Sequence, residues 1–149
     1  MKILGIESSC DDTSVSLIEA SEEGFVVIAE KTASQIEIHK KYGGVVPEVA
    51  ARAHAEYIMP LIEEVIGQDK SFVRQLADQG KPDVIAVTSG PGLMTALLVG
   101  VEAAKTLSYL WDVPLVGVNH IEGHIHSVLV SNQELGIRNQ GREIEFPAL

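Results

Sequence analysis

The stretch that decides the fold is Ile3-Leu4-Gly5-Ile6-Glu7-Ser8-Ser9-Cys10-Asp11-Asp12-Thr13-Ser14-Val15-Ser16-Leu17-Ile18. Residues 3–7 form a short apolar run. Residues 13–18 alternate serine with valine and leucine, which is the period-2 pattern of a half-buried strand. The polar residues 8–12 between the two runs predict a turn. After a second turn at 21–24, residues 25–29 are again rich in β-forming residues, so the three runs predict an antiparallel meander.

Beyond this meander the hydrophobic period becomes helical. Pro47 suits the first turn of a helix, and Gly67 suits its stop, which predicts a helix over 47–66. The remaining elements follow in order: an apolar strand at 83–88, a long apolar helix at 93–110, a second buried strand at 115–118 and a helix that begins at His120 with Asn119 as its cap. A short helix is predicted at 71–79, and a loop at 131–145.

This order, β-β-β-α-β-α-β-α, predicts an α/β fold with a mixed five-stranded sheet and helices on both faces. Three antiparallel strands would be extended by two parallel ones. The arrangement resembles the ribonuclease-H-like, actin-like (ASKHA) lobe shared by actin, sugar kinases and Hsp70-type chaperones. A Rossmann sheet begins strand-helix-strand and fits poorly. The length fits one domain, so we expect residues 1–149 to form a single lobe.

The composition is that of an ordinary globular protein, with 46% hydrophobic and 21% charged residues. No apolar run has the length of a membrane span, and the first residues do not resemble a signal peptide. Cys10 is the single cysteine, which excludes an internal disulfide and suits a reducing compartment, so we expect a cytoplasmic protein. The net charge of −10 predicts that other chains or segments supply most of the basic surface if the protein acts on RNA.

The most informative side chains are two histidines at the predicted helix start. His120 and His124 are four residues apart, so a helix places them on one face, where two imidazoles can converge on one metal ion. Glu122 and His126 lie off that face, so neither is placed as a further ligand or as the general base of an H-E-x-x-H peptidase. The alternative is a pair of histidines that pack or cap the helix start. Two ligands alone would be an incomplete site.

The turn at 8–13 is the second candidate site. Its amides and hydroxyls can hold phosphate oxygens, which makes Ser9 and Cys10 candidates for nucleotide binding, although Ser and Asp also dominate ordinary turns. The Ser-Gly-Pro-Gly-Leu segment at 89–93 joins a strand to a helix N-terminus, but no lysine follows, so it is no P-loop. The other histidines are interpreted as ordinary loop and helix residues: His39 and His54.

Four segments together resemble one family closely. The chain is similar to the tRNA N6-adenosine threonylcarbamoyltransferase family along nearly its whole length. The matching segments stand in the family's order: Ile6-Glu7-Ser8-Ser9-Cys10-Asp11-Asp12-Thr13, Tyr42-Gly43-Gly44-Val45-Val46-Pro47-Glu48, Gly90-Pro91-Gly92-Leu93 and His120-Ile121-Glu122-Gly123-His124.

The resemblance implies a transferase that moves threonylcarbamoyl from threonylcarbamoyl-adenylate to N6 of adenosine 37 in tRNAs reading codons that begin with A. It implies that His120 and His124 bind one divalent metal, iron or else zinc. It makes Asp11 and Asp12 candidates for positioning the acceptor or aiding proton transfer, although many members have Glu at the position of Asp12. A paralogous partner subunit and an ATPase are the other implied partners.

Family members are more than twice as long, so the resemblance implies that residues 130–149 lead to a second lobe. That lobe would supply an aspartate metal ligand and most of the adenosine pocket, and we expect the 149-residue chain alone to be inactive. One alternative is a non-catalytic partner that dimerises through helices near 47–66 and 93–110, where a face of small residues admits another helix (Ala96, Gly100, Ala103 and Ala104). A metallopeptidase and a kinase or ATPase of the same superfamily are weaker alternatives.

Overall fold

The computed structural model describes residues 1–22, 24–68, 81–127 and 130–132. Its first three strands are β1 (Lys2–Glu7), β2 (Asp12–Ser21) and β3 (Gly24–Ser34). β2 pairs antiparallel with both β1 and β3, which confirms the predicted meander. β3 is longer than the predicted run because its second half, which follows Ala29, is polar and leaves no apolar alternation to detect.

Two parallel strands extend this meander on the side of β1. β4 (Val84–Gly90) pairs with β1, and β5 (Leu115–Asn119) pairs with β4. The order β5-β4-β1-β2-β3 is the predicted mixed sheet, and the ribonuclease-H-like fold class is confirmed. The strand count is corrected, because β6 (Val130–Asn132) adds a sixth strand beside β3 where the sequence predicts the start of a loop. Three residues are too few to show a period in sequence.

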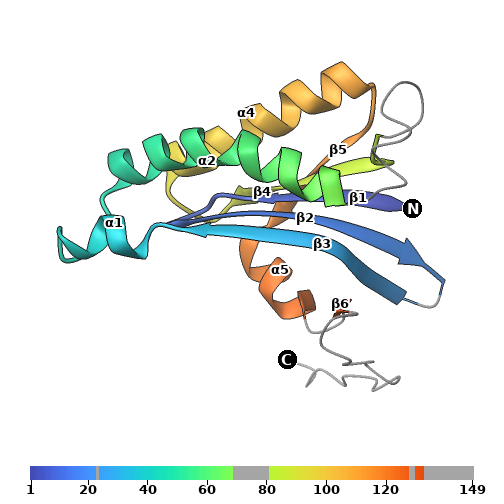
Figure 1. Cartoon of the computed structure of the whole chain (residues 1–149), viewed down its shortest axis with the longest axis horizontal. Helices are drawn as coiled ribbons and strands as arrows, with labels where there is room; N and C mark the ends of the chain where they lie inside the picture. The colour runs from blue at the N-terminus through green and yellow to red at the C-terminus, as the bar shows by residue number, and fades with distance from the viewer. Residues whose placement is uncertain (23, 69–80, 128–129, 133–149) are drawn as a thin grey trace.

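Four helices complete the described part of the chain: α1 (Ile36–Lys40), α2 (Pro47–Gln68), α4 (Met94–Trp111) and α5 (His120–His126). α2 and α4 lie side by side over one face of the sheet, and α5 lies against the other (Figure 1). Helices therefore cover both faces, as predicted. The sequence does not predict α1, whereas the helix predicted at 71–79 lies outside the described residues.

The core lies between the sheet and the pair α2 and α4. The register of β1, β2 and β4 aligns the buried side chains of the core in rows that run across the three strands. Leu4 of β1 is flanked by Leu17 of β2 and Ile85 of β4, and all three are fully buried. The next row repeats the arrangement two residues on, with Ile6, Val15 and Val87. Because side chains alternate across a strand, Glu7 and Thr88 point to the opposite face, toward α5.

Two expectations about packing are wrong. β5 is not a buried strand but the edge of the sheet, and Val116 remains 48% exposed. Apolar composition alone does not separate an edge strand from a central one. The small residues of α4 face the chain's own interior, where a Cβ atom on Gly100 would collide with Ser8. The outer face of α4 is instead apolar and exposed, with Met94 at 77% and Leu98 at 51%.

Within the described residues, no helix is both long and apolar enough to cross a membrane.

Candidate functional site

The candidate site lies at the carboxyl ends of the three parallel strands. β1 ends at Glu7, β4 at Gly90 and β5 at Asn119, and these ends meet at one edge of the sheet. α5 starts directly after β5. The Asn119 side-chain oxygen accepts hydrogen bonds from the amides of Ile121 at 2.9 Å and Glu122 at 3.3 Å, which confirms the predicted cap.

Glu7 is the central acceptor of this edge. Ile6 pairs with Val87, so Glu7 and Thr88 are neighbours on the same face, and the Thr88 hydroxyl donates to Glu7 Oε2. The Ser9 amide donates to the other oxygen, Oε1. Burial raises the pKa of Glu7, but hydrogen bonds from Ser9, Thr88 and His120 outweigh burial and leave that pKa below its ordinary value. Glu7 is therefore a carboxylate at neutral pH.

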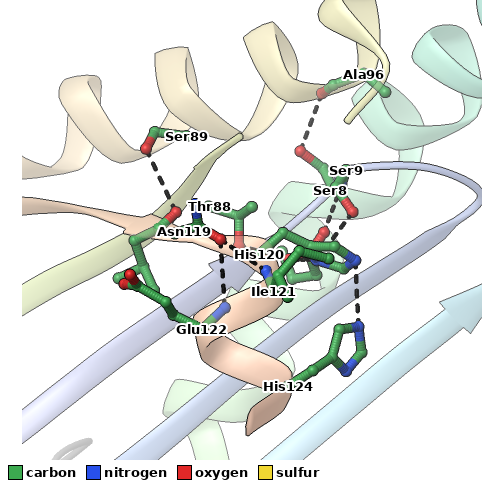
Figure 2. A network of polar contacts seen from close by, with 12 residues as sticks. Ser8, Ser9, Thr88, Ser89, Ala96, Asn119, His120, Ile121, Glu122 and His124 are labelled. Atoms are coloured by element: carbon green, nitrogen blue, oxygen red, sulfur yellow. Dashed lines mark hydrogen bonds and ion pairs between the residues drawn. The ribbon is translucent and has the colours of Figure 1, made fainter. Parts of the chain in front are cut away.

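The two histidines of α5 turn toward each other, as the sequence predicts (Figure 2). Nε2 of His120 and Nε2 of His124 are 3.2 Å apart, and the ring centroids are 4.4 Å apart at an interplanar angle of 79°. Nδ1 of His120 lies on the other side of its ring, 3.2 Å from Glu7 Oε2 and 3.3 Å from Ser9 Oγ. Glu122 points away from this pair in Figure 2.

The donor set fits half of a metal site. Two metal–nitrogen bonds of about 2.0–2.1 Å that meet at roughly 100° would place their nitrogens near the observed 3.2 Å. That angle lies between octahedral and tetrahedral values, so the separation of the two nitrogens suits binding to one ion. Among the described residues, however, no group of three or more His, Cys, Asp or Glu side chains is placed to hold a metal. The residues present would supply two ligands of a larger set.

The turn that connects β1 to β2, residues 8–11 (the acidic turn), is held in place by hydrogen bonds to three consecutive carbonyl oxygens. The Ser9 carbonyl accepts from the Leu93 amide at 2.7 Å, the Cys10 carbonyl from His54 Nε2 at 3.1 Å, and the Asp11 carbonyl from the Gln35 amide at 3.0 Å. The donors come from different parts of the fold: the loop before α4, the body of α2 and the residue before α1. The turn is therefore a fixed part of the structure.

His54 lies beneath this turn and is fully buried. Its Nδ1 is 2.7 Å from the Thr13 hydroxyl, and its Nε2 donates to the Cys10 carbonyl. Burial lowers the pKa of His54, although the carbonyl and the nearby carboxylates of Glu7 and Asp11 oppose this shift. The sequence interpretation of His54 as an ordinary helix residue missed this role, because only the fold brings α2 beneath the turn.

The structure divides the predicted site residues into two groups. Ser9 lies at the histidines, whereas the thiol of Cys10 is exposed, Asp11 is half-buried and Asp12 is exposed at the start of β2. Partial burial, a hydrogen bond with Asp11 and the surrounding negative charge raise the pKa of the Cys10 thiol. The carboxylate in contact with His120 is Glu7, which sequence reasoning did not single out. The available signal was its position one residue after the buried Ile6.

Fold and site together define the class of this protein as an actin-like, ribonuclease-H-type α/β lobe with a paired-histidine helix at the carboxyl ends of its parallel strands. The fold resembles that of YeaZ from Pseudomonas aeruginosa, with a TM-score of 0.54 and 18% identity over 80% of this chain and 43% of that one. At this identity the likeness shows the fold alone.

Similarity in sequence identifies the family, which the likeness of fold does not. The family model for TsaD, tRNA N6-adenosine threonylcarbamoyltransferase, matches residues 26–143, and the chain belongs to this family. The curated transferase of Koribacter versatilis is 47% identical over 147 residues, which are 99% of this chain and 35% of that protein. The transferase of Carboxydothermus hydrogenoformans is 52% identical over 123 residues, 83% of this chain and 34% of that protein. The chain thus spans about a third of these relatives.

Proposed function

We propose that this chain is the N-terminal part of a tRNA N6-adenosine threonylcarbamoyltransferase, and that His120 and His124 hold its divalent metal. In this proposal the complete enzyme moves threonylcarbamoyl from threonylcarbamoyl-adenylate to N6 of a tRNA adenosine. Family membership supports the reaction class. The observation that supports the metal is the pair of facing Nε2 atoms 3.2 Å apart at the carboxyl edge of the sheet.

Each named residue has a definite task in this proposal. A bound metal would act as a Lewis acid and template for oxygens of the donor substrate. His120 and His124 offer it two neutral nitrogens, and the missing ligands come from outside the described residues. Asp11 and Asp12 are proposed to orient the acceptor or to take its proton, while the Ser9 and Cys10 segment contributes to binding the nucleotide portion. The net charge of −10 favours tRNA contacts made largely by other segments or partner subunits.

Metal content tests the proposal directly. Protein purified without oxygen should carry iron or zinc, measured by plasma mass spectrometry, and the metal should be absent from the His120→Ala, His124→Ala double variant. Loss of both ligands removes every nitrogen of the half-site. His126→Ala is the matched control because His126 is on the same helix and bonds to the Glu122 carbonyl instead. Equal metal content in the wild type and the double variant would contradict the assignment.

The second candidate is a binding role in which the lobe pairs with a second chain of the same fold. The specific observation is the exposed apolar face of α4, where Met94 and Leu98 lie one turn apart with 77% and 51% of their surfaces exposed. Large exposed apolar side chains that adjoin one another are typical of protein interfaces. The proposed surface is this outer face of α4 together with the adjoining α2.

Sedimentation equilibrium tests whether the chain pairs with itself through α4. The wild-type chain is expected to dimerise as its concentration rises, whereas Leu98→Asp should remain monomeric because a charge would be desolvated in the contact. Ile36→Asp is the control, since Ile36 is 60% exposed on α1, outside the proposed surface. A monomeric wild type at all concentrations, or a dimer that survives Leu98→Asp, would exclude self-pairing through α4.

A further inference from the structure

We propose that Glu7 is a positioning residue. Its carboxylate accepts a hydrogen bond from the Nδ1–H group of His120, which keeps the ring proton on Nδ1 and leaves Nε2 unprotonated and aimed at the metal position. The inference deepens the proposed metal site and rests on it for its functional meaning. The carboxylate, its contact with His120 and the facing nitrogens all belong to residues that the structure describes.

The chemistry of the two groups fixes the direction of the hydrogen bond between Glu7 and His120. A carboxylate has no proton to give, so a contact of 3.2 Å between Glu7 Oε2 and His120 Nδ1 requires the proton on the ring nitrogen. Ser9 Oγ is also near Nδ1, at 3.3 Å, but its hydroxyl donates to the Glu7 carboxylate, so both bonds are compatible. A neutral imidazole carries one N–H. The proton on Nδ1 therefore leaves a lone pair on Nε2.

The proton of the neighbouring ring, His124, has a defined position as well. When no metal ion lies between them, two Nε2 atoms 3.2 Å apart need one proton between them, because two lone pairs would repel each other. Since His120 holds its proton on Nδ1, His124 must supply this one from Nε2 in the metal-free chain. To bind a metal through Nε2, His124 must move its proton to Nδ1, whereas His120 needs no change. His120 is thus prepared for metal binding, and His124 is the ring that switches.

Two hydrogen-bond donors hold the Glu7 carboxylate in place, which lets it fix the tautomer of His120. Its Oε1 is held by the Ser9 amide, and its Oε2 by the Thr88 hydroxyl from the neighbouring strand. The parallel registry of β1 and β4 sets the Thr88 contact, so the sheet itself orients the carboxylate. In metalloproteins, a carboxylate on the outer nitrogen of a ligating histidine fixes the ring tautomer and raises the ring's basicity.

Nitrogen-15 NMR of the imidazoles, followed by titration with Zn²⁺ alone, tests the assignment on the 149-residue chain. At about pH 8, where an ordinary imidazole is neutral, we expect His120 with its proton on Nδ1 and His124 with its proton on Nε2. Zinc should move the ring proton of His124 from Nε2 to Nδ1 and leave the tautomer of His120 unchanged. Glu7→Gln should give His120 a mixture of tautomers and weaken zinc binding about 10- to 100-fold.

Two controls separate positioning from a general loss of structure. His126 bonds through Nδ1 to the Glu122 carbonyl, 2.9 Å away, so its signals should not move in Glu7→Gln. Glu122→Gln makes the same chemical change on α5 without a contact to His120 and should bind zinc like the wild type. Thr88→Val keeps the carboxylate but removes its donor, and should shift the His120 tautomer in the same direction by a smaller amount.

The outcomes distinguish this inference from the proposed function. A wild-type His120 protonated on Nε2, or unchanged zinc affinity in Glu7→Gln, would overturn the role of Glu7 and leave the histidine pair as a metal site. A His120 tautomer that depends on Glu7, in a chain that binds no zinc, would support the positioning contact. It would at the same time count against metal binding by this lobe.

Discussion

Replacing Gly92 with alanine is expected to lower the free energy of unfolding by about 2–4 kcal/mol, through overpacking and a lost hydrogen bond. A Cβ atom at this position would lie 2.6 Å from the Ser9 carbonyl oxygen and 2.8 Å from Ser9 Cβ. The obstructing carbonyl is backbone, so no side-chain rotation relieves the contact. The segment before α4 would have to move away from the acidic turn and weaken the bond from the Leu93 amide to Ser9.

Urea denaturation measures this loss, and Gly67→Ala is the matched control. Gly67 lies in the last turn of α2, where an added Cβ atom would meet nothing within 4 Å. There, alanine should be neutral or stabilising by up to about 1 kcal/mol. Equal midpoints for Gly92→Ala and the wild type would show that the turn and the loop before α4 are not in the close contact described above.

Replacing His54 with leucine is expected to cost about 2–4 kcal/mol of stability, because the buried Thr13 hydroxyl and the Cys10 carbonyl lose their hydrogen bonds. The Thr13 hydroxyl and the Cys10 carbonyl both contact the imidazole. Leucine has a similar volume but satisfies neither group. The loss should again appear as a lower urea midpoint. His126→Leu on the exposed α5 surface is the control and should change stability by less than about 0.5 kcal/mol.

His54 also predicts how stability depends on pH. Burial lowers its pKa in the folded chain, so between that value and the ordinary pKa of about 6.5 the unfolded chain binds more protons. The stability that His54 contributes is thus fully present above about pH 6.5, falls as pH decreases through this window, and levels off below the folded pKa. His54→Leu should show a shallower loss between about pH 7.5 and 5.5. Parallel curves for the two proteins would contradict a buried neutral histidine.

The sequence predicts the sheet well because alternation within a strand reflects burial directly. The runs that contain Leu4, Val15 and Ile85 all form strands of the predicted kind and order. Errors arise where a strand lacks that pattern. The polar half of β3 and the three residues of β6 are set by backbone pairing to a neighbour, which leaves little trace in side-chain chemistry.

In the candidate site, too, the sequence predicts what depends on neighbouring residues and misses what depends on distant ones. The spacing of His120 and His124 fixes their common face, because helix geometry relates residues four apart whatever the rest of the chain does. Glu7 stands 113 residues from His120, and no local rule joins them. Their contact follows from the parallel pairing of β1 with β4 and of β4 with β5, which brings the ends of these strands to one edge.

The sequence by itself determined the order of β1 to β5 with α2, α4 and α5, the cap at Asn119 and the shared face of the two histidines, because each depends on residues close together in the chain. Only the tertiary structure decided that Glu7 contacts His120, that His54 supports the acidic turn and that β5 is an edge strand. Those features depend on which distant segments pack together, and many sequences with the same local periodicity would pack differently.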